Sequence, residues 1–242
     1  MTKRSGFQFK QFQIFHDRCA MKVGTDSIML GSWAHPEGAG RILDIGTGSG
    51  LLAIMQAQKS SADTRIVGID LDDAAVEQAM ENAALSPWAA QIEIQHTSLQ
   101  AFRSDDNFDV VISNPPYYSV NAKAIKEAAI NQQRQQARLT GSLDLEDLVK
   151  NALRLLSDKG RIFLVLPVEQ HQNLRMLVRE YGLHINRQLM VKARPDSEVI
   201  RGLFCLSAEA GQAPLETLTI YARQTEYSDA YKLLCRDYYL NF

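Results

Sequence analysis

The run Asn114-Pro115-Pro116-Tyr117 combines hydrogen-bond acceptors with a flat aromatic ring. Proline fixes φ and has no backbone donor, so Pro115 and Pro116 hold the carbonyl oxygens of Asn114 and Pro115 in place as unpaired acceptors. The ring of Tyr117 can stack on a planar group. We therefore expect this turn to hold a planar NH2 group, with its two hydrogens bound by the Asn114 side-chain oxygen and the Pro115 carbonyl.

A second pattern is the glycine-rich run at 46–50, which follows a short apolar segment. Glycines let the backbone turn tightly and approach a ligand, and the helix that follows presents free N–H groups. Asp44 lies two residues before Gly46, and Asp70 ends the next apolar run, where a carboxylate can accept both hydroxyls of a ribose. Residues 48–53 also satisfy the dinucleotide pattern G-x-G-x-x-A, so this loop alone leaves a nicotinamide enzyme open.

Together, the two patterns resemble the signature of S-adenosylmethionine (SAM)-dependent methyltransferases that act on exocyclic amino or amide nitrogens. Asp-x-Gly-x-Gly-x-Gly at 44–50 matches the loop of that family, and Asn-Pro-Pro-Tyr matches its reactive turn. A hydride-transfer enzyme has no evident use for the second pattern. The resemblance implies SAM as cofactor, a Rossmann-like class I fold, and direct methyl transfer with Asn114, Pro115, Pro116 and Tyr117 as the catalytic turn.

The resemblance also implies a set of cofactor contacts. In the family, the segment before the first strand covers the methionine end of the cofactor, which implies contacts from Lys22, Gly24, Thr25 and Asp26. The remaining implied contacts are Asp44, Gly46, Thr47, Gly48, Gly50, Asp70, Leu71, Ser98 and Asn114. The loop at 96–100 departs from the family because it lacks the acid that many relatives place against the adenine amino group, and Ser98 is the polar residue available in its stead.

Composition and residue spacing argue against several classes of protein and several kinds of site. The net charge of −2 and pI near 6.2 argue against a protein that coats nucleic acid evenly. The three cysteines lack a Cys-x-x-Cys spacing, none follows a proline, and the histidines show no i, i+4 pairing, so we expect reduced thiols, no cysteine nucleophile and no metal site. No export signal or run of ~20 apolar residues is seen, so we expect a soluble, cytoplasmic protein without membrane contact.

The patterns must be positioned by alternating strands and helices. Apolar runs predict strands at 41–45, 65–70, 92–95, 109–114 and 161–166, with helices at 51–59, 72–84, 145–156 and 169–181. After Gly182, three strand-like runs follow at 183–191, 199–206 and 215–221, which predicts antiparallel pairing, and the tail at 227–242 predicts a docked helix. The expected fold is α/β, a doubly wound seven-stranded sheet with an antiparallel last strand.

The first 40 residues form a separate part of the expected organisation. Alternation at 7–15 predicts a short β-ribbon with a slip in register near Lys10 and Gln11, and Thr25 or Asp26 is placed to cap a short helix. We expect residues 1–40 to be a ribbon and capping helix, and residues 41–242 to be the methyltransferase domain, as a single structural unit.

Three substrate classes fit the reactive turn: adenine N6 in RNA or DNA, guanine N2 in ribosomal RNA, and the amide of a protein glutamine. About 40 residues precede the first strand, too few for the helical domain that glutamine methyltransferases of release factors usually carry, and no segment is long enough for a DNA target-recognition domain. The compact arrangement resembles the bacterial adenine-N6 methyltransferases that modify the adenine just 3′ of a valine tRNA anticodon, position 37. A protein-glutamine or guanine-N2 methyltransferase, or an RNA-binding module without catalysis, stays as an alternative.

The resemblance implies a tRNA partner, the anticodon stem-loop of a valine tRNA. We expect a monomer that binds no DNA. Local basic residues support RNA binding, and the candidate contacts are Lys123, Lys126, Arg134, Arg138 and Arg194. Release of counterions from the phosphate backbone would make such binding sensitive to salt. The same residues fit equally well on a solvated surface, so they remain candidates.

Overall fold

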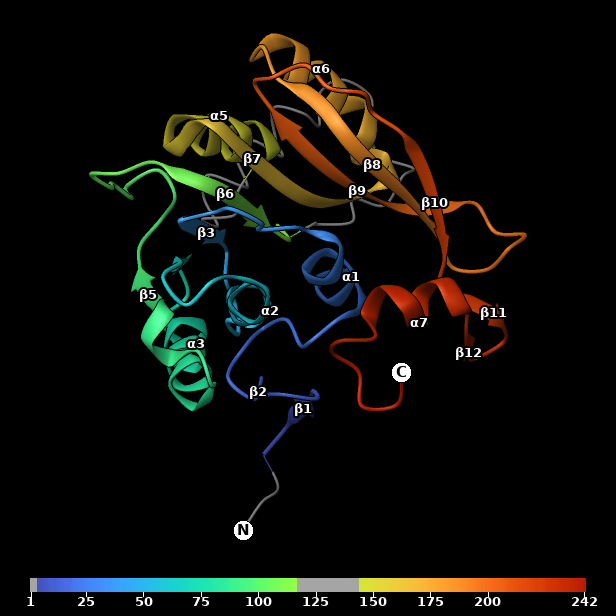
Figure 1. The fold of residues 1–242 in the computed structure, drawn as a ribbon, viewed down its shortest axis with the longest axis horizontal. Helices are drawn as coiled ribbons and strands as arrows, with labels where there is room; N and C mark the ends of the chain where they lie inside the picture. Colours follow the sequence, from blue (N-terminus) through green and yellow to red (C-terminus); the bar gives the residue numbers. More distant parts are fainter. Residues whose placement is uncertain (1–3, 117–143) are drawn as a thin grey trace.

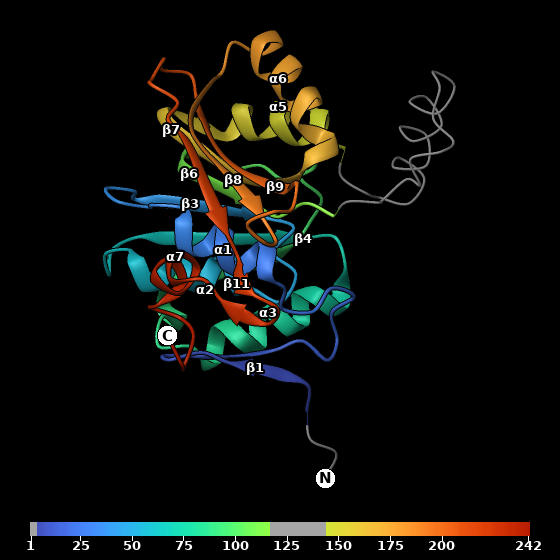
Figure 2. The same ribbon diagram turned by 90° about the vertical axis from the view of Figure 1, so that its right-hand side faces the viewer.

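A central sheet lies between two layers of helices in the computed structural model, which describes residues 4–116 and 144–242 (Figures 1 and 2). One layer holds α1 (Thr25–Trp33), α2 (Leu51–Lys59) and α3 (Asp73–Leu85), and the other holds α5 (Leu145–Leu155) and α6 (His171–Glu180). Each face of the sheet has its own buried cluster, with α1 and α2 in one and α5 and α6 in the other.

The large sheet has eight strands in the order β10-β8-β9-β7-β6-β3-β4-β5. Their bounds are β3 Arg41–Ile45, β4 Arg65–Asp70, β5 Ile92–His96, β6 Phe108–Ser113, β7 Leu156–Pro167, β8 His184–Lys192, β9 Val199–Ser207 and β10 Leu215–Thr219. Val110, Val111 and Ile112 of β6 are fully buried, as expected of a strand covered by helices on both faces. The doubly wound α/β fold predicted from the sequence is confirmed.

The sheet differs from the prediction at its carboxyl-terminal end. The reversed strand is β9, which pairs antiparallel with both β7 and β8, and it lies inside the sheet. The eighth strand, β10, then adds to the outer edge of β8 in parallel. The prediction of seven strands with the last one reversed was therefore one strand short, because the run at 215–221 was not counted within the sheet.

The amino-terminal ribbon is a β-hairpin of β1 (Gly6–Gln8) and β2 (Gln13–Phe15). The predicted slip in register near Lys10 and Gln11 is wrong. These residues form the hairpin turn, closed by a 2.8 Å hydrogen bond from Phe9 N to the Phe12 carbonyl. Phe9 and Phe12 are both buried and stack with ring centroids 4.5 Å apart, which explains why the apolar alternation breaks between them.

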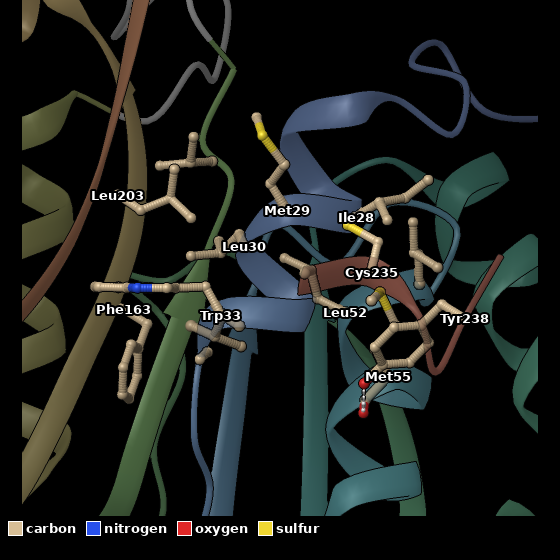
Figure 3. Packing of buried hydrophobic residues seen from close by; sticks show 14 of the residues in the cluster. Ile28, Met29, Leu30, Trp33, Leu52, Met55, Phe163, Leu203, Cys235 and Tyr238 are labelled. Atoms are coloured by element: carbon tan, nitrogen blue, oxygen red, sulfur yellow. Dashed lines mark hydrogen bonds between the residues drawn. The ribbon is translucent and has the colours of Figure 1, made fainter. Parts of the chain in front are cut away.

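Helix α1 packs deeply beneath the sheet, with Ile28, Met29, Leu30 and Trp33 buried (Figure 3). Its N-cap residue is Gly24, and no side chain caps it, so the predicted cap by Thr25 or Asp26 is wrong. The far end of α1 is closed by Lys59, whose ammonium group donates to the carbonyls of Gly31 at 2.6 Å and of Ser32 and Ala34.

The carboxyl-terminal tail is less helical than predicted for 227–242. After the short ribbon of β11 (Tyr221–Arg223) and β12 (Glu226–Tyr227), helix α7 spans only Asp229–Cys235. The side chain of Tyr238 turns inward beyond the helix and donates to the Met55 carbonyl at 3.0 Å, so the tail leaves the helical path to bury this ring (Figure 3).

Candidate active site

The glycine loop and the Asn-Pro-Pro turn begin at neighbouring ends of parallel strands. Asp44 of β3 pairs in register with Ile112 of β6, and the Ser113 hydroxyl donates to the Ile45 carbonyl at 2.8 Å. Strand β3 has β4 on one side and β6 on the other, so the strand order reverses at this point. Open α/β sheets bind ligands beyond the carboxyl ends of the strands at such a switch point.

The three loop glycines adopt a left-handed backbone, with φ of +67° at Gly46, +55° at Gly48 and +79° at Gly50. A Cβ atom added at Gly46 or Gly48 would meet nothing within 4 Å, so the space beside the first half of the loop is open. At Gly50 the same atom would lie 3.3 Å from the Cα of Ala79 in α3. The first two glycines therefore leave a cradle for a ligand, and the third lets α3 pack closely.

Main-chain bonds fix this loop to the end of β4. The Ile69 carbonyl accepts from the amides of Gly46 and Thr47 at 2.9 and 3.0 Å, and the Asp70 carboxylate accepts from the Gly48 amide at 2.8 Å. The Thr47 side chain is buried and donates to Asp44 at 2.6 Å, and its carbonyl accepts from the Gly50 amide at 2.9 Å. These bonds hold the shape of the loop, and a contact of Thr47 with the cofactor stays a prediction.

Asp44 is completely buried, and burial raises the pKa of its carboxyl to about 7. One oxygen accepts from the Thr47 hydroxyl and from the Ala53 amide at 3.1 Å, whereas Oδ1 has no partner. A buried acceptor without a partner normally has one supplied by a ligand or water. A carboxylate with a free oxygen beside an open glycine cradle fits the cationic amino end of SAM.

Asp70 and Leu71 follow β4 and lie next to the loop. Each Asp70 oxygen accepts one backbone bond, from Gly48 N and from Asp72 N at 3.0 Å, and retains lone pairs for the hydroxyls of a ribose. Leu71 is 51% exposed, so its side chain is accessible to the flat face of a base. The His96 ring braces this turn, with Nε2 2.9 Å from the Leu71 carbonyl and Nδ1 3.0 Å from Asp73.

Ser98 begins the loop after β5, as predicted. Its hydroxyl accepts from the Ala101 amide at 3.1 Å and so closes a turn. The hydroxyl proton remains available, and Ser98 is only partly buried.

The reactive turn is joined to α1 through one side chain. The Asn114 amide nitrogen donates to the Ser27 hydroxyl at 2.9 Å, Pro115 is buried, and Pro116 is exposed. Tyr117 lies outside the described residues. The predicted proximity of the segment before the first strand to this site is thus seen at Ser27, a residue that the sequence reasoning did not select.

The other residues predicted in that segment have different surroundings. Lys22 and Gly24 are exposed. Within residues 4–116 and 144–242, neither of these two residues makes a hydrogen bond to the glycine loop. The Asp26 carboxylate accepts from Arg201 of β9 at 2.8 Å, with both side chains about one-third exposed. This pair holds the start of α1 against the reversed strand.

The candidate RNA contacts are mostly beyond what the structure describes. Lys123, Lys126, Arg134 and Arg138 lie outside the described residues. Arg194 is exposed in the turn between β8 and β9, where its amide donates to the Ser197 hydroxyl at 3.0 Å. Arg194 is therefore accessible to a large ligand, and nothing in its contacts ties it to the glycine loop.

A buried asparagine of α3 connects the amino-terminal hairpin to the glycine loop. The Asn82 side chain accepts from Phe15 N at 2.9 Å and donates to the carbonyls of Phe15 and Ser49, each at 2.8 Å. Asn82 is completely buried. Sequence reasoning missed it because a single asparagine in a predicted helix carries no signal of the three partners that tertiary packing brings to it.

The described residues bear on the predictions that the protein has no metal site, no membrane contact and no cysteine nucleophile. No cluster of three or more His, Cys, Asp or Glu side chains there is arranged to hold a metal ion. Among the helices formed by residues 4–116 and 144–242, none combines the length and apolar character needed to cross a bilayer. Burial raises the pKa of the Cys205 and Cys235 thiols to about 11, which makes them poor nucleophiles.

Comparison with known proteins agrees with this geometry. Residues 19–186 match the family model described as methyltransferase small domain. A protein of Pseudoalteromonas atlantica named tRNA1(Val) (adenine(37)-N6)-methyltransferase is 45% identical over 264 residues, which cover 99% of this chain and 100% of that protein. A protein of the same name from Bacteroides thetaiotaomicron is 44% identical, with 97% of each chain covered.

Solved structures show the same fold at lower sequence identity. A predicted O-methyltransferase of Agrobacterium tumefaciens superposes with a TM-score of 0.64 at 17% identity, covering 88% of this chain and 96% of that one. The ribosomal protein L11 methylase of Lactobacillus delbrueckii gives a TM-score of 0.51 at 22% identity, with 75% and 76% covered. At these identities the likeness concerns the fold alone, a Rossmann-like SAM-dependent methyltransferase.

Proposed function

The chain belongs to the methyltransferase small domain family, among relatives named tRNA1(Val) (adenine(37)-N6)-methyltransferase, and on that premise we propose that it methylates N6 of adenine 37 in tRNA1(Val). SAM supplies the methyl group from its sulfonium centre. The observation that carries the proposal is the 45% identity over 99% of the chain to a relative of that name. The placement of Asn114 one strand away from the glycine loop agrees with it.

At the reacting nitrogen, the roles follow from the chemistry of the turn. The Asn114 side-chain oxygen and the Pro115 carbonyl accept the two hydrogens of the adenine amino group, while Tyr117 stacks on the base and Pro116 stiffens the turn. Hydrogen bonds of this kind favour a pyramidal nitrogen with its lone pair directed at the methyl group, so they stabilise the transition state more than the planar ground state. SAM bound beside this turn would supply an electrophilic methyl group with a neutral thioether as its leaving group, and the methylated nitrogen would lose one of its two hydrogens as a proton to water.

On the cofactor side, we assign contacts to three places. Asp44, with Gly46, Thr47, Gly48 and Gly50 of the loop, holds the amino acid end of SAM. The ribose and adenine are then assigned to Asp70, Leu71 and Ser98, and the segment of Lys22, Gly24, Thr25 and Asp26 is assigned to the carboxylate end. The unpartnered Asp44 Oδ1 and the open cradle at Gly46 and Gly48 support this assignment.

The remaining proposals concern the partner and its setting. We infer that the anticodon stem-loop of a valine tRNA is bound by Lys123, Lys126, Arg134, Arg138 and Arg194. We also infer a cytoplasmic monomer, in which residues 1–40 form the ribbon and capping helix and residues 41–242 form the methyltransferase domain as a single structural unit. Binding should weaken steeply with salt because the contacts are to phosphates.

Nucleoside mass spectrometry tests the function directly. The purified chain is incubated with SAM and an unmodified tRNA1(Val) transcript, and in parallel with a transcript carrying guanine at position 37, with a release factor and with ribosomal RNA. We expect one N6-methyladenosine per transcript with adenine 37 and none with guanine 37. Methylation of the release factor glutamine, or of guanine in ribosomal RNA, with tRNA left unchanged would contradict the proposal.

A further inference from the structure

A loop at residues 17–22 lies between the amino-terminal hairpin and α1. None of its six residues belongs to a helix or strand, and five of them are exposed. Cys19 is the one member that is partly buried. The path of the 17–22 loop is therefore set by the contacts at its base and along its length.

The buried imidazole of His16 closes this loop at its base. Its Nδ1 accepts from the Val23 amide at 3.3 Å, and its Nε2 lies 3.0 Å from the Ser5 hydroxyl. A backbone N–H can only donate, so Nδ1 must carry a lone pair, and the single proton of a neutral ring then lies on Nε2. The Ser5 hydroxyl oxygen accepts that proton. The bond to Val23 therefore requires one tautomer of neutral histidine, and a protonated ring cannot make it.

The surroundings of the ring favour the neutral form. His16 is 9% exposed, and burial, followed by the charge of Lys22, lowers the pKa of its imidazole. The Asp17 carboxylate acts in the opposite direction and more weakly. At neutral pH, most His16 is therefore uncharged and able to accept from Val23.

Along its length, the loop is held against α3. The Arg18 amide donates to the Gln78 side-chain oxygen at 3.4 Å, and Gln78 is completely buried. The Arg18 guanidinium lies 3.6 Å from the Glu81 carboxylate. Helix α3 begins after the turn that carries Asp70, so these contacts bring the loop towards the end of β4.

Cys19 shows what lies on the inner side of the loop. Burial, and then the charges of Asp70 and Asp72, raise the pKa of its thiol to about 11. Water and salt screen such charges beyond about 10 Å, so Cys19 lies close to the turn at the end of β4. Asp70 also accepts from the Gly48 amide of the glycine loop. The 17–22 loop therefore borders the place assigned to the ribose.

We propose that His16 is a positioning residue for cofactor binding, because its neutral imidazole holds residues 17–22 against the ribose end of the SAM site. His16 acts through the loop and is not placed at the reacting atoms. A chain whose loop is open part of the time binds SAM more weakly, in proportion to the closed fraction. The inference rests on the proposed function only in taking SAM as the ligand of the glycine cradle.

Alkylation with iodoacetamide, followed by peptide mass spectrometry, reports the state of the loop without turnover. Cys205 and Cys235 are 3% and 0% exposed, so they react when the whole chain unfolds, whereas Cys19 reacts whenever the loop opens. In the wild-type chain, SAM at about ten times its Kd should slow the alkylation of Cys19 by at least about threefold, because SAM favours the closed loop.

Three substitutions separate the two bonds of the His16 ring. His16→Asn keeps an acceptor near the position of Nδ1, His16→Gln places its amide near Nε2 and loses the bond to Val23, and His16→Phe loses both bonds. Cys19 should react about 10- to 100-fold faster in His16→Gln and His16→Phe, since an open loop returns the thiol to water and towards its ordinary pKa. In these two variants the Kd for SAM should rise by at least about fivefold.

Two proteins should behave like the wild type. In His16→Asn, the alkylation rate of Cys19 and the Kd for SAM should stay within about threefold of the wild-type values, because the acceptor for Val23 is retained. His184→Gln replaces an exposed histidine at the start of β8 and is the matched control for His16→Gln.

Three results would contradict the role of His16. The first is faster alkylation of all three cysteines in His16→Gln and His16→Phe, which would mean that His16 stabilises the whole fold. The second is an equal rate at Cys19 in the Asn, Gln and Phe variants. The third is a Cys19 thiol that SAM leaves unprotected in a chain that binds SAM in a calorimetric titration. A wild-type chain in which SAM protects Cys19 but adenine 37 stays unmethylated overturns the proposed function instead.

Discussion

The glycine loop and the Asn-Pro-Pro turn start at neighbouring strand ends, yet the protein holds them in different ways. The loop is fixed by main-chain donors at Gly46, Thr47 and Gly48 and by the fully buried Asp44. Among the described residues, the turn has two prolines without donors and a single side-chain bond, from Asn114 to Ser27. The loop is thus held by bonds within the protein, whereas no partner for the acceptors of the turn is found in residues 4–116 and 144–242.

This difference matches the two tasks of a methyltransferase. The loop binds a ligand of constant shape, so its geometry can be set in advance by bonds that the ligand does not replace. The turn acts on charge that develops during reaction, and acceptors without internal partners can interact with it most strongly at that moment. We therefore expect substitutions in the turn to lower kcat and substitutions around the loop to lower stability and SAM affinity.

The largest effect is expected for Asn114→Ala. Removing a group that acts mainly in the transition state should lower kcat on the order of 10²- to 10³-fold, while the Kd for SAM and for tRNA stays within about threefold of wild type. Single-turnover methylation and calorimetric titration measure these quantities. Asn173→Ala is the matched control, since Asn173 of α6 also makes one side-chain bond among the described residues, to Gln170 just before that helix. Turnover that survives Asn114→Ala would contradict the assigned mechanism.

The second effect concerns the support of the loop. Asn82→Ala leaves Phe15 N and the carbonyls of Phe15 and Ser49 without their bonds, and at about 1 kcal/mol for each bond the free energy of unfolding should fall by about 3 kcal/mol. Urea denaturation measures the loss, and SAM affinity should weaken with it because Ser49 belongs to the loop. Asn151→Ala, which loses only a bond to the Asp147 carbonyl, should cost about 1 kcal/mol. Equal losses in the two variants would refute the role of Asn82.

The glycine loop and the buried strands are the parts of the molecule that could be predicted from the sequence. The loop was predictable because a left-handed backbone favours glycine, so the positions of Gly46 and Gly48 in the sequence indicate where the backbone leaves space for a ligand. The strands were predictable because burial on both faces demands continuous apolar runs such as Val110 to Ile112. Both are local constraints on residue type.

What could not be predicted depends on contacts between distant segments. Ser27 meets Asn114 across 87 residues, and Asn82 meets Phe15 across 67, and neither serine nor asparagine is required by its local conformation. The run at 215–221 was predicted as a strand, but its letters do not show that residues 215–219 pair in parallel with the outer edge of β8, so the reversed strand was placed at the end of the sheet. Tertiary packing decides such cases.

A smaller effect, of about tenfold in affinity per pH unit, is expected from Asp44. Burial raises its pKa to about 7, so the folded protein holds a proton that the unfolded chain has lost above about pH 4. The contribution of Asp44 to the stability of the ligand-free protein should therefore fall as pH rises from about 4 to about 7. The cationic end of SAM favours the ionised carboxylate, so SAM affinity should rise over the upper part of that range and level off above about pH 7.

Calorimetric titration in two buffers of different ionisation enthalpy tests this linkage. At pH 6, binding of SAM should release about one proton per site. Asp44→Asn cannot ionise, so it should release none from this position and should remove the part of the pH dependence of stability between about pH 4 and 7 that Asp44 contributes. Identical proton release by wild type and Asp44→Asn would place the titrating group elsewhere.

The smallest effect is expected for the ion pair of Asp26 and Arg201, which joins the start of α1 to β9. Asp26 and Arg201 lie 2.8 Å apart, but their side chains are 29% and 32% exposed, so a double-mutant cycle should give a coupling energy of about 0.5–1 kcal/mol. The cycle uses Asp26→Asn and Arg201→Gln, with unfolding measured in urea at low and high salt. The more exposed pair of Arg18 and Glu77, 3.5 Å apart, is the control and should couple less.

Salt should reduce the coupling between Asp26 and Arg201, since solvent reaches both side chains. A coupling above about 2 kcal/mol that salt does not change would mean that the pair is shielded from water as the Asp44 carboxylate is. The start of α1 would then be held as firmly as the glycine loop. In that case the contrast between a closed loop and a lightly held turn would apply only to Asn114 and the prolines, and not to the helix that orients them.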